Sequence, residues 1–151
     1  MTKKVRETVR LKYNGLCAYT GKPLGEDWQI DHITSRHMHF YNCHFNSTSE
    51  EEIFLKNKEV DNIENLLPAI KIINHYKRSL DLEAFRRYMI NFHKRLKKLP
   101  KKTVIERTRK RIEYMNKVAE LFDITPEKPF EGKFYFETIK PINEVKYGYS
   151  N

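Results

Sequence analysis

The chain has 151 residues and a mass of 18.3 kDa, a size that suits about one domain with a moderate core. Its formal net charge of +9 and sequence pI near 9.5 favour polyanionic partners, nucleic acid first. Two cysteines are too few for a disulfide framework, and no apolar run approaches the ~20 residues that span a bilayer. Because the N-terminus also lacks an apolar signal segment, we expect a soluble, cytoplasmic protein with no membrane partner.

The N-terminal third of the chain is predicted to contain one short helix and a small β-hairpin. Residues 3–13 carry apolar side chains at helical spacing, and Gly15 would end that helix because glycine suits a left-handed cap. Residues 16–24 contain glycine and proline turn signals, and residues 28–33 alternate as a strand does. Together these two segments predict the hairpin.

Residues 34–61 are predicted to form a long inserted loop, which is uncommon in a compact domain and often functional. A short helix capped by Ser49 is predicted within it, over residues 50–58. The segment also holds four side chains of the kind that bind zinc, at spacings that match no zinc motif: His37, His39, Cys43 and His44. The sequence does not decide whether these side chains form a separate metal site. It also allows a disulfide between Cys43 and Cys17, although two reduced thiols are the simpler interpretation.

The second half of the chain is predicted to be mainly helical. Apolar residues at helical spacing predict helices over 65–79, over 82–98 with Asp81 as N-cap, and over 103–122. Residues 130–138 alternate between apolar and polar side chains and predict a short terminal strand.

Basic residues gather on the second and third of these helices. Between Arg86 and Lys117 there are 13 Lys or Arg residues against two Glu residues. One interpretation is that these basic residues are simply the solvated faces of two helices. However, like charges three and four residues apart oppose helix formation, and a phosphate backbone would relieve that repulsion. We therefore predict a nucleic-acid-binding surface, for DNA if the resemblance described next holds, made of Arg86, Arg87, Lys94, Arg95, Lys97, Lys98, Lys101, Lys102, Arg107, Arg109, Lys110 and Arg111.

Three segments, residues 17–24, 30–33 and 65–77, occur in an order and at spacings that resemble the HNH family of endonucleases. The resemblance covers roughly residues 11–88, over half the chain. It implies an α+β protein with a ββα-metal core, in which a β-hairpin and a helix clasp a metal ion. An N-terminal helix would precede this core, and a C-terminal helical extension ending in a short strand would follow it.

The family's functional residues fall on five positions of this chain. An acidic residue and a histidine end a strand, here Asp31 and His32. The family's middle Asn, at the helix start, is Asn65; its last His or Asn lies nine residues later, at Asn74; and a basic residue often follows, here Lys77. The resemblance implies hydrolysis of DNA phosphodiester bonds, by nicking or by double-strand cleavage.

Elementary chemistry agrees with these roles. A neutral imidazole can accept a proton from water, so His32 suits a general base. A hard divalent cation such as Mg²⁺ or Mn²⁺ prefers oxygen ligands, which Asp31 and the amide oxygen of Asn74 supply. We expect Asn65 to bond the backbone near His32 and fix the imidazole's direction, and we expect Arg36 to reach the scissile phosphate as an auxiliary.

The sequence departs from the family where many members bind a structural zinc ion on two Cys-x-x-Cys pairs. The first pair reads Cys17 and Thr20 here, and the second reads Ile70 and Ile73. One thiol cannot make a four-coordinate zinc site, so no structural zinc is expected. Two isoleucines three apart share a helix face, and we predict that they pack against Cys17 and Tyr19 as an apolar cluster.

Two parts of the chain are expected to pack as one domain. Residues 1–80 would form the HNH core with its N-terminal helix and the inserted loop 34–61, and residues 81–151 would form the basic helical extension. Similar extensions in bacterial and phage or prophage HNH proteins suggest a protein of the bacterial host cell. A homodimer is possible, since concerted cutting of both strands needs two sites. Alternatives are a catalytically silent nucleic-acid-binding module and an RNA nuclease.

Overall fold

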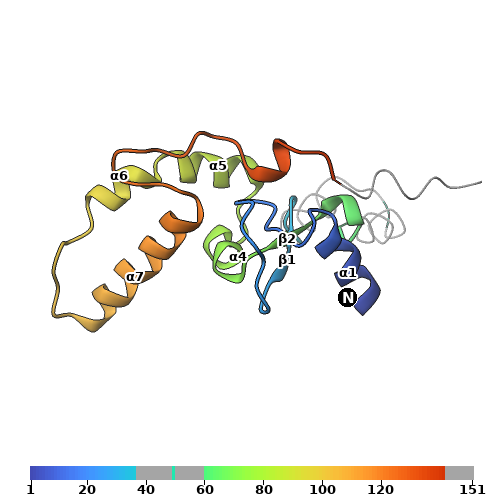
Figure 1. Cartoon of the computed structure of the whole chain (residues 1–151), viewed down its shortest axis with the longest axis horizontal. Coiled ribbons are helices and arrows are strands. Elements are labelled where there is room, and N and C mark those ends of the chain that lie inside the picture. Colours follow the sequence, from blue (N-terminus) through green and yellow to red (C-terminus); the bar gives the residue numbers. More distant parts are fainter. Residues whose placement is uncertain (37–48, 50–59, 142–151) are drawn as a thin grey trace, which may run out of the picture. The chain divides into compact units, whose positions relative to one another are not determined.

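The protein is described by a computed structural model that covers residues 1–36, 49 and 60–141 (Figure 1). The described residues form five α-helices and a two-stranded antiparallel sheet, which confirms the mixed α+β class. The chain divides into two compact units: a first unit of Met1–Leu82 and Phe134–Asn151, and a second unit of Glu83–Lys133. The predicted boundary after residue 80 lies close to this division, but the terminal segment belongs to the first unit. That the two parts pack as one domain stays a prediction.

The sheet of the first unit pairs β1 (Gln29–His32) with β2 (Leu66–Ala69) in antiparallel register, with Asp31 opposite Leu67. Figure 1 shows the two strands side by side. The predicted hairpin within residues 16–33 is therefore wrong, because the partner of β1 comes from after the long inserted segment. Residues 16–24 instead form a turn with one isolated antiparallel bridge, between Leu16 and Pro23.

The predicted helix over 65–79 is also wrong in its first part. All four residues of β2 are buried, as in a strand covered on both faces, and proline within them opposes a helix beyond its first turn. Helix α4 (Lys71–Lys77) begins only after Ile70, whose backbone is extended. It packs against β1, so the two strands and this helix follow one another along the chain and contact each other through β1.

Helix α1 (Lys3–Leu11) is fastened to the sheet by two cations. Lys12, just after the helix, is buried and donates from Nζ to the carbonyl oxygens of Ile63 at 2.9 Å and Leu66 at 3.1 Å. These carbonyls belong to the 3-10 helix η1 (Ile63–Asn65) and to β2. Arg6 stacks on the Trp28 ring at 4.0 Å and donates to the Trp28 carbonyl at 2.6 Å. Arg6 therefore holds α1 against the residue before β1, and Lys12 holds it against the first residue of β2.

The predicted strand over 130–138 is wrong: the chain there forms the 3-10 helix η2 (Tyr135–Glu137). The Glu137 carboxylate accepts from the Phe134 amide at 2.8 Å and closes this turn, which explains why the alternating pattern does not extend. The Tyr135 and Phe136 amides donate to the carbonyls of Tyr19 and Ala18, at 3.2 and 2.7 Å. The terminal segment therefore covers residues 18 and 19 of the first unit.

The second unit contains most of α5 (Leu82–Ile90), with α6 (Phe92–Lys97) and α7 (Glu106–Leu121). The single helix predicted over 82–98 is interrupted at Asn91, whose ψ of 7° leaves the helical range. Of the apolar residues predicted at helical spacing, Phe85, Met89, Phe92, Leu96, Met115 and Ala119 are buried, whereas Ile112 and Phe122 are half-buried and Ile105 is 62% exposed. In the part of the chain that the structure describes, none of the helices has the length and apolar character that crossing a bilayer requires.

Candidate active site

The end of β1 carries a buried ion pair. Asp31 is only 6% exposed, and its carboxylate lies 3.3 Å (Oδ1) and 3.1 Å (Oδ2) from Nζ of Lys77, which is fully buried on α4. The same ammonium donates to the His32 carbonyl oxygen at 2.9 Å. Lys77, predicted to be catalytic, is therefore placed against the protein's own carboxylate and backbone. This placement makes it a residue that positions Asp31 and His32.

Tyr19 completes the surroundings of Asp31. Its hydroxyl donates to Asp31 Oδ2, and its ring packs edge-on against Phe134 at 5.2 Å between centroids. Burial, followed by the negative charge of Asp31, raises the pKa of Tyr19 well above its usual value. The hydroxyl therefore stays protonated and remains a donor to the carboxylate. Sequence analysis had considered Tyr19 only as an apolar neighbour of Cys17.

Asn74 lies beside this ion pair and is held by β1. Its Nδ2 donates to Gln29 Oε1 at 2.8 Å. Gln29 and Asp31 are two residues apart on a strand and share a face, while Asn74 and Lys77 are three apart on α4 and share a side of the helix. The two elements thus meet through two matched contacts, Gln29 with Asn74 and Asp31 with Lys77. The structure brings the two predicted metal ligands to the same face of β1.

His32 points to the other side of the strand and meets a carboxylate that sequence analysis missed. Its Nε2 lies 2.9 Å from Asp61 Oδ1, and Arg36 holds both oxygens of Asp61 at 2.8 Å. Hydrogen bonds from Arg36 and then from His32 lower the pKa of Asp61 below its usual value. All three side chains are reachable from solvent, with exposed fractions of 15% for His32, 63% for Arg36 and 46% for Asp61.

Asn65 clamps the segment that follows His32. Its Oδ1 accepts from the Thr34 amide at 2.9 Å, and its Nδ2 donates to the carbonyls of Thr34 at 3.2 Å and Val60 at 2.8 Å. Its own carbonyl accepts from the Ile33 amide at 3.0 Å. The predicted bonding of the backbone near His32 is thus observed. Its setting differs from the prediction, because Asn65 ends η1 and precedes a strand.

The donor chemistry at this site fits a hard divalent cation. Asp31 offers carboxylate oxygens. Asn74 uses its amide nitrogen to donate to Gln29, so its amide oxygen is the atom that could bind a cation. The Lys77 ammonium already neutralises Asp31, so a cation would compete with it. Among the described residues, no three His, Cys, Asp or Glu side chains gather as a metal site of their own. The four donors from His37 to His44 and the helix predicted over 50–58 lie outside the described residues.

The positions at which the HNH resemblance would place a zinc site contain buried side chains. Cys17 is a buried free thiol, and Ile73 and Tyr19 are also buried. Ile70 is half-buried and precedes α4, so the expectation that it shares a helix face with Ile73 is wrong. The absence of a structural zinc ion stays a prediction.

Ten of the twelve predicted DNA-binding cations are exposed on the second unit, and two are not. Arg86 donates to Glu83 at 3.1 Å and to the Gly132 carbonyl at 2.5 Å. Arg95 stacks on the Tyr88 ring at 3.7 Å and donates to its carbonyl at 2.7 Å. These two arginines have structural partners. The exposed residues are Arg87, Lys94, Lys97, Lys98, Lys101, Lys102, Arg107, Arg109, Lys110 and Arg111.

Comparisons of the chain with protein-family models, with curated proteins and with solved structures gave no match. The interpretation of the site therefore depends on the residues and geometry described above.

Proposed function

We propose that this protein is a divalent-metal-dependent DNA endonuclease of the HNH type, with a ββα-metal core formed by β1, β2 and α4. One observation carries the proposal. The residues selected by motif order contact β1 or the residue that follows it, although up to 46 positions separate them: Asp31, His32, Asn65, Asn74 and Lys77.

His32 is proposed to act as the general base. Asp61 occupies its Nε2, which leaves Nδ1 as the ring nitrogen that accepts a proton from the attacking water. Asn65 holds the backbone after His32 and keeps the imidazole in place. Arg36 is proposed to bind the scissile phosphate, whose oxygens would replace the Asp61 carboxylate in the arginine's two hydrogen bonds.

Asp31 and Asn74 are the residues that would hold the metal ion, Mg²⁺, Mn²⁺ or another divalent cation. When bound, such a cation stabilises negative charge on the phosphate and on the leaving oxygen. Tyr19 and Lys77 bind the Asp31 carboxylate and hold it in position. Lys77 also holds the His32 carbonyl, which connects the ligand to the base.

The test is cleavage of supercoiled plasmid with Mg²⁺, Mn²⁺ and several other divalent ions. Wild-type protein should produce nicked or linear DNA, and His32→Ala should lower the rate by roughly 10²–10⁴-fold. The matched control is His75→Ala, which removes an exposed histidine of α4. If no metal supports cleavage, or if His32→Ala cuts at the wild-type rate, the proposal fails.

An RNA of the same sequence separates a DNA nuclease from an RNA nuclease. The ratio of nicked to linear product tests a dimer with two sites.

A catalytically silent nucleic-acid-binding module is the second candidate, and one observation favours it. Both proposed metal ligands already have protein partners, Lys77 for Asp31 and Gln29 for Asn74. This alternative predicts salt-sensitive DNA binding that His32→Ala leaves unchanged, without cleavage under any condition.

A further inference from the structure

The connection between α6 and α7, residues 98–105, exposes two large apolar side chains next to each other. Val104 is 103% exposed and Ile105 is 62% exposed, so both are in water. Single exposed apolar residues are common on protein surfaces, but two neighbours at a turn form a small apolar tip. We refer to Val104 and Ile105 as the apolar tip.

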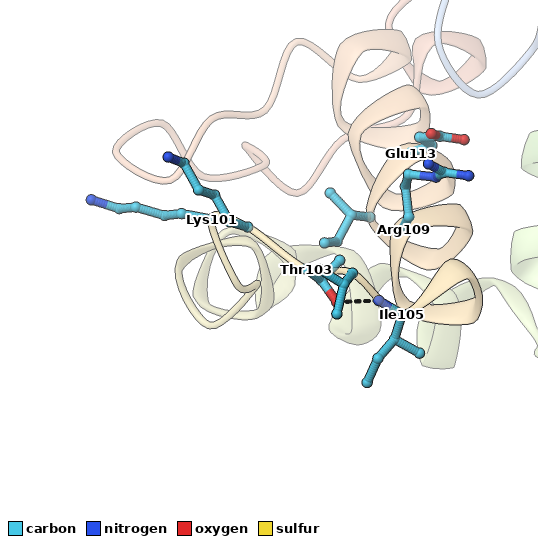
Figure 2. A pocket seen from close by; sticks show the side chains of 8 residues that line it. Lys101, Thr103, Ile105, Arg109 and Glu113 are labelled. Carbon is cyan, nitrogen blue, oxygen red and sulfur yellow. Dashed lines mark hydrogen bonds between the residues drawn. The ribbon is translucent and has the colours of Figure 1, made fainter.

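Ile105 stands at a position where an apolar residue lowers stability. It is the N-cap of α7, and its side chain makes no capping hydrogen bond. Its amide is bonded to Thr103 Oγ1 at 3.2 Å, as drawn in Figure 2. Ser, Asp and Asn are favoured at N-caps because their side chains accept from the first free amides, whereas Ile ranks among the poorest. Local rules of this kind are broken at functional or strained sites, which makes Ile105 a candidate for a functional role.

Three cations lie near the apolar tip. Lys101, Lys102 and Arg109 line, together with the tip, an open hollow of about 820 Å³ (Figure 2). In Figure 2 the Lys101 side chain extends away from α7, and the Ile105 side chain projects outward beyond the start of the helix. Both lysines are exposed, so their ammonium groups are accessible to an anionic partner that contacts the tip.

We propose that the apolar tip is a wedge that enters the minor groove of duplex DNA, partly unstacks a base step and bends the duplex, while Lys101 and Lys102 bind the flanking phosphates. Minor-groove architectural proteins use one or two apolar side chains in this way, next to basic residues. The choice of DNA as the partner rests on the proposed function; the wedge itself can be tested without cleavage.

An anionic membrane is the competing partner for a basic and apolar surface. Membrane-surface helices carry an apolar face along their whole length. The first turns of α7 are instead polar and charged on almost every side, with the sequence Glu106-Arg-Thr-Arg-Lys-Arg111. Two apolar side chains at one turn are enough for a base step and too few for a stable membrane contact.

The experiment measures binding and bending of a short duplex labelled at both ends, in metal-free buffer, by fluorescence anisotropy and energy transfer. The double variant Val104→Ser/Ile105→Ser should bind roughly tenfold more weakly and lose the bend, with an unchanged salt dependence. Lys101→Ala/Lys102→Ala should instead lower the slope of log K against log[salt] by about 1.8, because two phosphate contacts are lost. Ile90→Ser, which alters a 40% exposed residue of α5, is the control.

The same variants distinguish a wedge from a structural role. Serine at position 105 is a better N-cap, so Val104→Ser/Ile105→Ser should melt about 2–4 °C higher while binding DNA more weakly. Unchanged affinity and bending in this variant would overturn the wedge. So would loss of binding to phosphatidylserine vesicles with DNA binding intact, since that result assigns the tip to a membrane. If wild-type protein bends DNA through the tip but never cleaves it, the nuclease proposal fails and the wedge stands.

Discussion

Lys77 Nζ lies 3.1 Å from Asp31 Oδ2 and 2.9 Å from the carbonyl oxygen of His32, so one buried ammonium holds both residues of the Asp-His pair. Neighbouring side chains on a strand point to opposite faces, and Asp31 and His32 do so here. Lys77 contacts both residues although their side chains point apart, because it binds the side chain of Asp31 and the backbone carbonyl of His32. The pair is thereby coupled from within the protein.

Lys77→Met is expected to lower the free energy of unfolding by about 3–5 kcal/mol, because it leaves the buried Asp31 carboxylate without its cation. The double variant Asp31→Asn/Lys77→Met should recover part of this loss, since no buried charge is then unpaired. Urea unfolding measures both effects. Lys71→Ala, which breaks an exposed pair with Asp27 at 3.5 Å, should cost less than about 1 kcal/mol. Equal effects of the two single variants would contradict the ion pair.

Tyr19→Phe is expected to lower the free energy of unfolding by about 1.5–3 kcal/mol through loss of a hydrogen bond to a carboxylate. It should also change the alkaline side of the stability profile. The pKa of Tyr19 is raised in the folded state, so the unfolded chain releases the phenol proton first. This contribution is present below the unfolded pKa and is lost as pH rises towards the folded pKa. Unfolding above pH ~10 should therefore depend less on pH in Tyr19→Phe than in a Tyr88→Phe control.

Asp61→Asn is expected to flatten the acid side of the same profile. The pKa of Asp61 is lowered in the folded state by Arg36 and His32, so the unfolded chain takes up the proton first as pH falls. The stabilisation is present above the unfolded pKa and is lost as pH falls through the folded pKa. Urea midpoints between pH 7 and pH 3 measure the difference. Asp27→Asn is the control, and identical acid sensitivity of wild type and Asp61→Asn would contradict the cluster.

Gly21→Ala is expected to lower the free energy of unfolding by about 1–3 kcal/mol for two reasons. Gly21 has a φ of +68°, and an added Cβ would lie 2.8 Å from the ring of Tyr135. Gly25 has a φ of +75° with nothing within 4 Å of the added atom, so Gly25→Ala should show only the conformational penalty, about 1 kcal/mol. Thermal melts of the two variants separate the steric part. A larger loss in Gly25→Ala would mean that the terminal segment does not cover this turn.

The residues of the candidate site could be predicted from sequence because their order and spacing are independent of the surrounding structure. Their secondary structure was harder to predict. Residues 66–69 are apolar on both faces, and a buried strand and a helix are hard to distinguish in so short a run, although proline at position 68 was a warning against the helix.

Asp61 and Tyr19 were missed for a different reason. Each acts through a contact across the fold, Asp61 with His32 and Tyr19 with Asp31. Periodicity reports which face a side chain occupies and says nothing about a partner 29 or 12 positions away. The alternation at 130–138 misled for a related reason, because a local bond from Phe134 to Glu137 closes the chain into a turn.

The bonds from Tyr135 and Phe136 to residues 19 and 18 have a consequence for synthesis on the ribosome. The second unit is inserted between two parts of the first, so Asp31, Tyr19 and Lys77 leave the exit tunnel well before the segment that covers Tyr19. The second unit can fold while the first is still incomplete. The candidate site therefore reaches its final packing only after residues 134–137 have also left the exit tunnel.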